Sequence, residues 1–179
     1  MPDMPVLHLY TNILQKTLRF ITNCLYEIQQ DDLCLQRGEM TAEELWRQSG
    51  LSGTYESWAF SDAPDKLAAL VRNGVKTAAC SAYDLYEAEG EPLPKEGDYS
   101  VILDSKGDAV CIIKTVKVYV AEFHQVSKDH AYKEGEGDRS LEYWRKVHID
   151  FLTRELERLN LTFTENTKVV CEEFELVSV

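Results

Sequence analysis

The sequence predicts an α+β fold, a small mixed β-barrel with flanking helices and an N-terminal helical extension. Residues 99–104 and 109–120 are rich in apolar and β-branched side chains, and the turn formers 105–108 between them predict a hairpin. Residues 141–159 instead place apolar side chains on one face of a helix. Short strands joined by tight turns, with helices inserted between them, are typical of a small mixed barrel.

The first 39 residues stand apart from the rest of the chain. Their apolar side chains recur at helical spacing and predict an amphipathic helix: Leu14, Leu18, Ile21 and Leu25. Thr41 and Glu44 then form a capping-box signature directly after Met40. We therefore divide the chain into an extension, 1–39, and a domain, 40–179. The extension is expected to pack on the domain, on a protein partner or on a second copy in a homodimer.

Between these regions, local signals predict the remaining elements. Asp62 is expected to cap a helix with Pro64 in its first turn, and Asn73-Gly74 to end it. An extended segment follows at 77–81, and residues 168–179 are expected to form the closing strand. The glycine-punctuated stretch 129–140 is too polar to be expected in the core.

Composition narrows the classes of function. The 179 residues carry a net charge of −12, which argues against a broad nucleic-acid footprint but allows a pocket for one nucleotide. The five cysteines are scattered without a CxxC pair, which indicates reduced thiols in a cytoplasmic protein. The four histidines form no zinc signature, so neither a metal nor another cofactor is expected. No apolar run is long enough to predict a membrane span.

The stretch NGVKTAACS, residues 73–81, places a single lysine, Lys76, among small and hydroxylic residues. Lys76 is either a solvated lysine at the start of a strand or a pocket lysine that meets an anion or an oxyanion. Residues 135–148 read GEGDRSLEYWRKVH. Together, the GxKT motif and this distant segment resemble the ASCH domain family, and the resemblance runs from about residue 41 to the end.

The resemblance implies a PUA-like β-barrel whose cleft suits RNA or a nucleotide-like ligand. Some small family members are amidohydrolases that remove the acyl group from N(4)-acetylcytidine, and others have been proposed as RNA-binding modules or ribonucleases. In the amidohydrolases the catalytic lysine corresponds to Lys76 and the glutamate partner to Glu134. The threonine nucleophile corresponds to Ala79, which has no hydroxyl. Thr77 and Ser81 flank that position and are candidate substitutes, and a water activated by Glu134 and Lys76 is another.

Further residues are candidates for ligand contacts. Trp58 and Phe60 either stack on a base or belong to the barrel core. Arg139 and Ser140 lie at the start of the long helix. They either face an anionic group such as a phosphate, or Ser140 only caps the helix.

Trp144, His148 and Cys80 are interpreted as structural. The expected function is an RNA-binding or nucleotide-binding module, whose ligand is a nucleotide, a modified nucleoside or a short RNA. The alternative is an enzyme, an amidohydrolase on acylated nucleosides or a ribonuclease. The substituted position Ala79 favours the module, whereas the retained Lys76 and Glu134 favour the enzyme.

Overall fold

The structure is a computed structural model that describes residues 40–179. Within it, Thr41–Val179 forms one compact unit. The predicted amphipathic helix and its proposed docking role fall in residues 1–39, outside the described part. None of the helices within 40–179 combines the length and the hydropathy needed to cross a membrane.

The described residues form five α-helices, one short 3-10 helix and five strands. The helices are α2 (Ala42–Ser49), α3 (Pro64–Arg72), α4 (Tyr83–Glu89), η1 (Phe123–Gln125), α5 (Lys128–Glu134) and α6 (Leu141–Arg158). The strands are β1 (Glu56–Ala59), β2 (Ala78–Ala82), β3 (Tyr99–Leu103), β4 (Ala109–Glu122) and β5 (Lys168–Ser178). The hairpin, the long helix and the closing strand all lie where the sequence predicted them.

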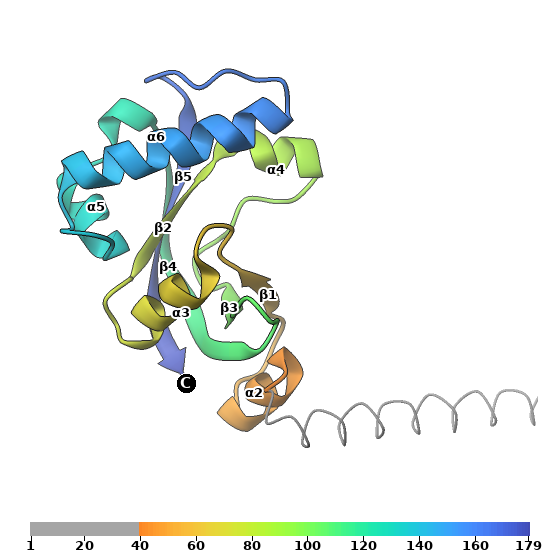
Figure 1. The fold of residues 1–179 in the computed structure, drawn as a ribbon. Coiled ribbons are helices and arrows are strands. Elements are labelled where there is room, and N and C mark those ends of the chain that lie inside the picture. Colours follow the sequence, from red (N-terminus) through yellow and green to blue (C-terminus); the bar gives the residue numbers. More distant parts are fainter. Residues whose placement is uncertain (1–39) are drawn as a thin grey trace, which may run out of the picture. The chain divides into compact units, whose positions relative to one another are not determined.

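All five strands form one sheet in the order β1-β3-β4-β5-β2. Only β1 and β3 pair in parallel; the other neighbours are antiparallel. The register shifts once between β3 and β4 and twice between β4 and β5, and such bulges increase the local twist. The sheet therefore curls into a half-barrel with helices around it (Figure 1), which confirms the α+β expectation.

Sequence signals predicted the N-cap of α2 correctly but not that of α3. Thr41 and Glu44 make both hydrogen bonds of a capping box at the start of α2, as predicted. The expected cap of α3 was wrong: Ala63 occupies the N-cap position at φ 46, without a side-chain bond. Asp62 instead forms an ion pair with Arg154 of α6, so a tertiary contact replaces the local one.

The expectation that 129–140 lies outside the core was also wrong for its first half. That half forms α5, whose His130, Ala131 and Glu134 side chains are buried. Two of the three are polar, and Glu134 is buried with partners, Lys76 and Trp144, that lie outside this stretch of the chain. Helix α4 was not predicted at all; it has no side-chain cap and buries none of its residues.

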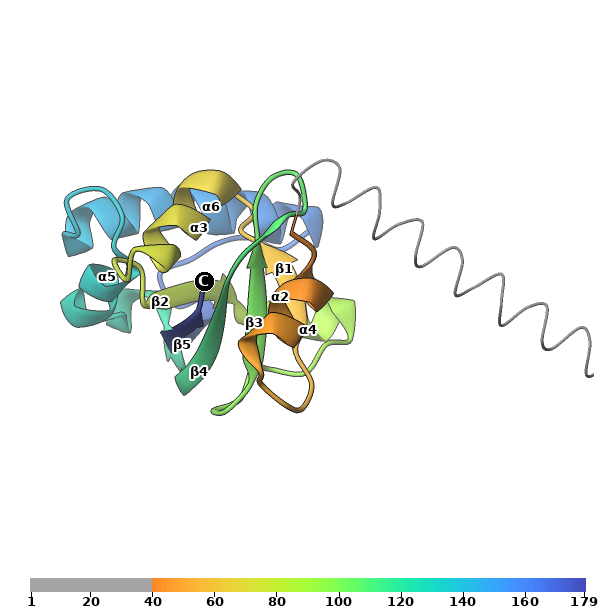
Figure 2. The ribbon, with the colours of Figure 1, turned by 90° about the horizontal axis from the view of Figure 1, so that it is seen from below.

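Strand β2 supplies neighbouring side chains to two separate core clusters. Ala82 belongs to a cluster to which α6 and β5 contribute most, and Cys80 packs against that cluster. Ala79 packs against the other cluster, in which α3 meets β3 and β4. Figure 2 shows α3 and α6 on the same side of the molecule, with β2 passing beneath them. Residues at the start of β2 therefore lie between the two clusters.

Candidate functional site

Lys76 is fixed by its backbone at the end of the turn after α3. The backbone N–H groups of Val75 and Lys76 both donate to the carbonyl of Leu70, and the N–H of Thr77 donates to the carbonyl of Lys133. These bonds turn the Lys76 side chain inward. It is only 2% exposed, so Lys76 is a buried pocket lysine and not a solvated one.

The Lys76 ammonium is held by two carboxylates. Its Nζ lies 2.7 Å from Oε2 of Glu134 and 3.0 Å from Oε1 of Glu136. It also lies 5.3 Å from the ring centroid of Phe60, within the range of a cation–π contact. The structure thus brings the predicted pair of Lys76 and Glu134 together and adds Glu136 to it.

The second carboxylate oxygen of Glu134 faces α6. Trp144 Nε1 donates to Oε1 of Glu134 at 2.7 Å. The ring nitrogens Nε2 of His148 and His130 lie 3.3 Å and 3.4 Å from the same oxygen. Glu134 is therefore the centre of a buried polar network that joins α5, α6 and the start of β2.

Two glycines allow this network to close. Gly135 ends α5 in the left-handed region at φ 74, and a Cβ there would lie 2.5 Å from the carbonyl oxygen of Val75. At Gly137 a Cβ would lie 2.4 Å from the ring of Tyr143. Only glycine lets the chain pass so close to the segment that carries Lys76 and to α6.

The charges of the pair reinforce one another. Burial favours the neutral form of Lys76, but Glu134 and Glu136 outweigh it and raise the lysine pKa above its ordinary value. Burial likewise favours the neutral form of Glu134, yet Lys76 and then His148 hold the pKa of that carboxyl well below its ordinary value. At neutral pH Lys76 is therefore an ammonium and Glu134 a carboxylate, and Lys76 in this state is a hydrogen-bond donor, not a base.

A pH dependence of stability follows from the lowered pKa of Glu134. A carboxyl with a depressed folded-state pKa stabilises the fold above its unfolded pKa of about 4.5, and this contribution is lost as the pH falls through the folded-state value. We expect the stability difference between the natural protein and Glu134→Gln to be constant near neutral pH and to shrink below about pH 4.5. Denaturant unfolding at a series of pH values measures it. A difference independent of pH would contradict the assignment.

A pocket of about 80 Å³ opens above the buried pair. Its polar residues are Lys76, Glu134 and Glu136 together with Ser61, Asp62, Cys80 and His148. Its apolar residues are Phe60, Leu67, Ala79, Val147 and Phe151. The loop before α3, the helices α3 and α6, and β2 therefore all contribute to one concave site with apolar walls and a charged floor.

Five of the predicted site residues do not line this pocket; Trp58 is described below, and each of the other four has another partner. The hydroxyl of Thr77 donates to the carbonyl of Lys133, and that of Ser81 shares a hydrogen bond with Tyr86. The hydroxyl of Ser140 accepts from the N–H of Tyr143, so it caps α6. The guanidinium of Arg139 lies 5.1 Å from the ring centroid of Tyr132.

Of the two predicted aromatic residues, only Phe60 lines the pocket. Trp58 packs edge-to-face against Phe60 at 5.0 Å and supports it from outside. Both also pack against the core cluster between α3 and the sheet.

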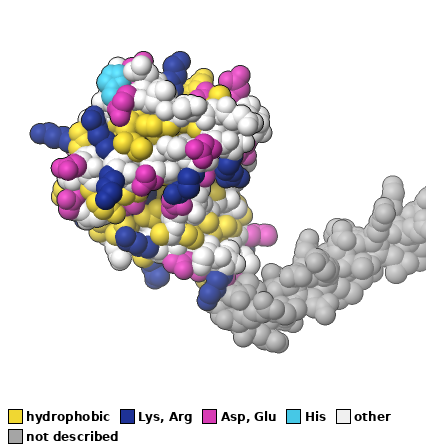
Figure 3. Space-filling view, turned by 45° about the horizontal axis from the view of Figure 1, so that its top comes forward, with side chains coloured by type: hydrophobic (Ala, Val, Ile, Leu, Met, Phe, Trp, Pro, Cys, Tyr) yellow, Lys and Arg dark blue, Asp and Glu magenta, His cyan; other side chains and the backbone are white. Residues whose placement is uncertain are grey.

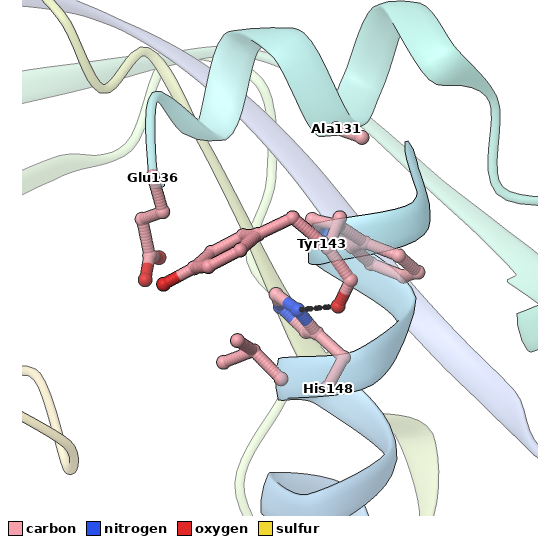
Figure 4. Close-up of a pocket in the computed structure, with 6 residues that line it drawn as sticks. Ala131, Glu136, Tyr143 and His148 are labelled. Atoms are coloured by element: carbon pink, nitrogen blue, oxygen red, sulfur yellow. Dashed lines mark hydrogen bonds between the residues drawn. The ribbon is translucent and has the colours of Figure 1, made fainter. Parts of the chain in front are cut away.

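Sequence reasoning missed Glu136, Cys80, His148 and the role of Trp144. Trp144 and His148 are buried, as interpreted, and their rings stack at 4.1 Å. Their polar atoms nevertheless point at Glu134, and a polar pair four residues apart on an apolar helix face was the available signal. Figure 4 shows a shallow hollow beside the pocket, where the Tyr143 hydroxyl points toward the Glu136 carboxylate.

The sequence profile of the ASCH domain matches residues 56–178 of this chain. The chain belongs to the ASCH domain family. A crystal structure of an ASCH domain from Lactobacillus crispatus JV V101 is 31% identical, with a TM-score of 0.72, and the match covers 76% of this chain and 94% of that one. A crystal structure of a protein from Enterococcus faecalis V583 is 35% identical, with a TM-score of 0.68, and the match covers 76% and 85%. Among curated proteins, none matches this ASCH protein.

Proposed function

We propose that the pocket of this ASCH protein binds a single nucleobase, carried by a nucleotide, a modified nucleoside or a short single-stranded RNA. The observation that carries the proposal is the combination of apolar and aromatic walls with a buried, charged floor of Lys76, Glu134 and Glu136. A flat ring can lie against the walls while its polar edge meets donors and acceptors on the floor.

The charge distribution supports recognition of one base in preference to a long strand. The chain carries a net charge of −12. The face in Figure 3 carries acidic and basic side chains interspersed with apolar ones, without a continuous basic track. A long strand gains affinity from many phosphate contacts, which this face does not offer. The carboxylates of Glu136 and Asp62 also line the pocket, and they repel a phosphate more than an uncharged base.

A hydrolase acting on acylated nucleosides, or a ribonuclease, is the second candidate. The buried pair of Lys76 and Glu134 favours it, because both residues match the catalytic positions of the amidohydrolases. The matched nucleophile position, Ala79, lines the pocket with a methyl group only. Thr77 and Ser81 have their hydroxyls bonded elsewhere, so a substitute would have to be Ser61 or a water.

Calorimetric titration with the four common nucleosides and with N(4)-acetylcytidine tests the proposal. We expect saturable binding of at least one nucleoside, weakened about tenfold or more by Phe60→Ala, because stacking on an aromatic ring contributes ~1–3 kcal/mol per base. Leu161→Ala is the control, since Leu161 is an exposed apolar residue that does not line the pocket. Equal binding by both variants would contradict the proposal.

The same samples are analysed by chromatography for conversion of N(4)-acetylcytidine to cytidine. Binding without conversion is expected for the natural protein. Conversion that is lost in Lys76→Arg would make the hydrolase the correct function, and conversion only in Ala79→Thr would show a binding pocket that lacks its nucleophile. A parallel incubation with single-stranded RNA, analysed for cleavage, tests the ribonuclease alternative.

A further inference from the structure

Three metal-ligating side chains meet at the floor of the pocket. The sulfur of Cys80, a carboxylate oxygen of Glu134 and a ring nitrogen of His148 all lie within 4.8 Å of one another. They come from β2, the last residue of α5 and the middle of α6. We propose that these three residues bind a divalent ion of borderline softness such as Zn²⁺, with the fourth coordination position open toward the pocket. Thiolate, imidazole and carboxylate are all zinc ligands, and three of them with one open position is typical of catalytic sites.

The distances already approach those of a tetrahedral site. His148 Nε2 and Glu134 Oε1 are 3.3 Å apart. Two ligand atoms that each lie about 2.0–2.1 Å from the same tetrahedral zinc are separated by about 3.3 Å. The imidazole and the carboxylate therefore need little movement, and the sulfur of Cys80 lies within 4.8 Å of both ligand atoms.

The surrounding hydrogen bonds orient two of the ligands. His148 Nδ1 lies 3.0 Å from the carbonyl oxygen of Trp144, which can only accept, so Nδ1 carries the proton. With a metal bound, the ring would be neutral and its lone pair would lie on Nε2, the nitrogen that faces Glu134. The indole N–H of Trp144 fixes the carboxylate of Glu134 at 2.7 Å. Both contacts are of the kind that orients metal ligands.

The floor of the pocket also carries other polar groups. The Lys76 ammonium faces the carboxylates of Glu134 and Glu136. The ring of His130 lies 3.4 Å from the same Glu134 oxygen that faces His148. An ion bound here would be met by the Cys80 sulfur as a thiolate, because metal binding displaces the thiol proton.

The inference goes beyond nucleobase binding and does not depend on it. An ion at this position would hold a water at the pocket, where Ala79 provides no hydroxyl. Metal uptake is measured without any nucleoside, so its failure would leave the proposed function unaffected.

Cobalt substitution tests the site. The full chain carries Cys24→Ala and Cys34→Ala, to remove the thiols of residues 1–39, and is stripped with a chelator and titrated with Co²⁺. We expect one ion per chain and a thiolate-to-cobalt charge-transfer band in the near ultraviolet. Cys80→Ala should abolish the band and weaken binding at least about tenfold. His148→Gln should weaken binding similarly but keep the band at saturation.

Matched variants elsewhere in the fold serve as controls. Cys111→Ala removes another buried thiol and His124→Gln an exposed imidazole, and both should leave uptake and spectrum unchanged. Cys171→Ala is decisive because Cys171 lies opposite Cys80 in the sheet register. Absence of stoichiometric uptake, a band that survives Cys80→Ala, or a band lost only with Cys171 would overturn the assignment. Circular dichroism confirms that each variant is folded.

Discussion

Replacing Glu134 by glutamine is expected to lower the free energy of unfolding by about 3 kcal/mol. Glutamine keeps the shape of the side chain and an acceptor for Trp144, so the substitution removes mainly the charge. It leaves the buried ammonium of Lys76 with Glu136 alone, 3.0 Å away. Breaking a buried ion pair costs ~3–5 kcal/mol, and the remaining carboxylate places this case at the lower end. Denaturant unfolding of both proteins measures the difference.

Asp129→Asn is the matched control for this prediction. Asp129 and Lys133 form an ion pair with the same separation as Lys76 and Glu134, 2.7 Å, but Asp129 is 71% exposed. Water and salt already compensate an exposed charge, so this variant should remain close to the natural stability. Similar losses in the two variants would show that burial does not make the Lys76–Glu134 pair different from a surface pair.

Gly135→Ala is the second substitution with a large expected effect. The residue adopts φ 74, and the added Cβ would lie 2.5 Å from the carbonyl oxygen of Val75 and 3.0 Å from the N–H nitrogen of Lys76. Backbone cannot move aside as the end of a side chain can. The left-handed conformation costs an alanine ~1–2 kcal/mol and the overpacking ~1–3 kcal/mol, so we expect a loss of about 2–5 kcal/mol. Thermal and denaturant unfolding measure it.

Gly90→Ala separates these two contributions. Gly90 ends α4 at φ 70, nearly the same conformation, but a Cβ there meets nothing within 4 Å. The Gly90→Ala variant should therefore lose only the conformational part, ~1–2 kcal/mol. If Gly90→Ala and Gly135→Ala lowered the free energy of unfolding equally, the contact between the added Cβ and the Val75 carbonyl would not destabilise the fold. The nucleoside titration should also be weakened by Gly135→Ala and unchanged by Gly90→Ala.

The sequence by itself determined the family and most of the regular structure. The strands around the 105–108 hairpin, the helix α6 and the closing strand follow from side-chain periodicity, which is a local property. The capping box of α2 and the glycine stop after α3 likewise depend on residues within one turn of each other. The GxKT motif and the segment that begins at His130 pointed to Lys76 and Glu134, and the same comparison showed that Ala79 lacks a hydroxyl.

Only the tertiary structure decided which charges are buried and where the hydroxyls point. Helix α5 looked like a solvated loop because its polar side chains have partners 10 to 58 residues away in the chain. For the same reason Asp62 left its expected cap for Arg154. The hydroxyls of Thr77 and Ser81 are directed by neighbouring elements, α5 and α4, that no strand periodicity can reveal.

The clustering of Cys80, Glu134 and His148 had no signal in the sequence. The three residues are 54 and 14 positions apart and lie on a strand and two helices. Each looked ordinary in its own segment: a thiol in a strand, one acid among several, and a histidine on an apolar helix face. Local rules establish the elements, but the close packing of α5 and α6 against β2 through Gly135 is what makes these residues neighbours.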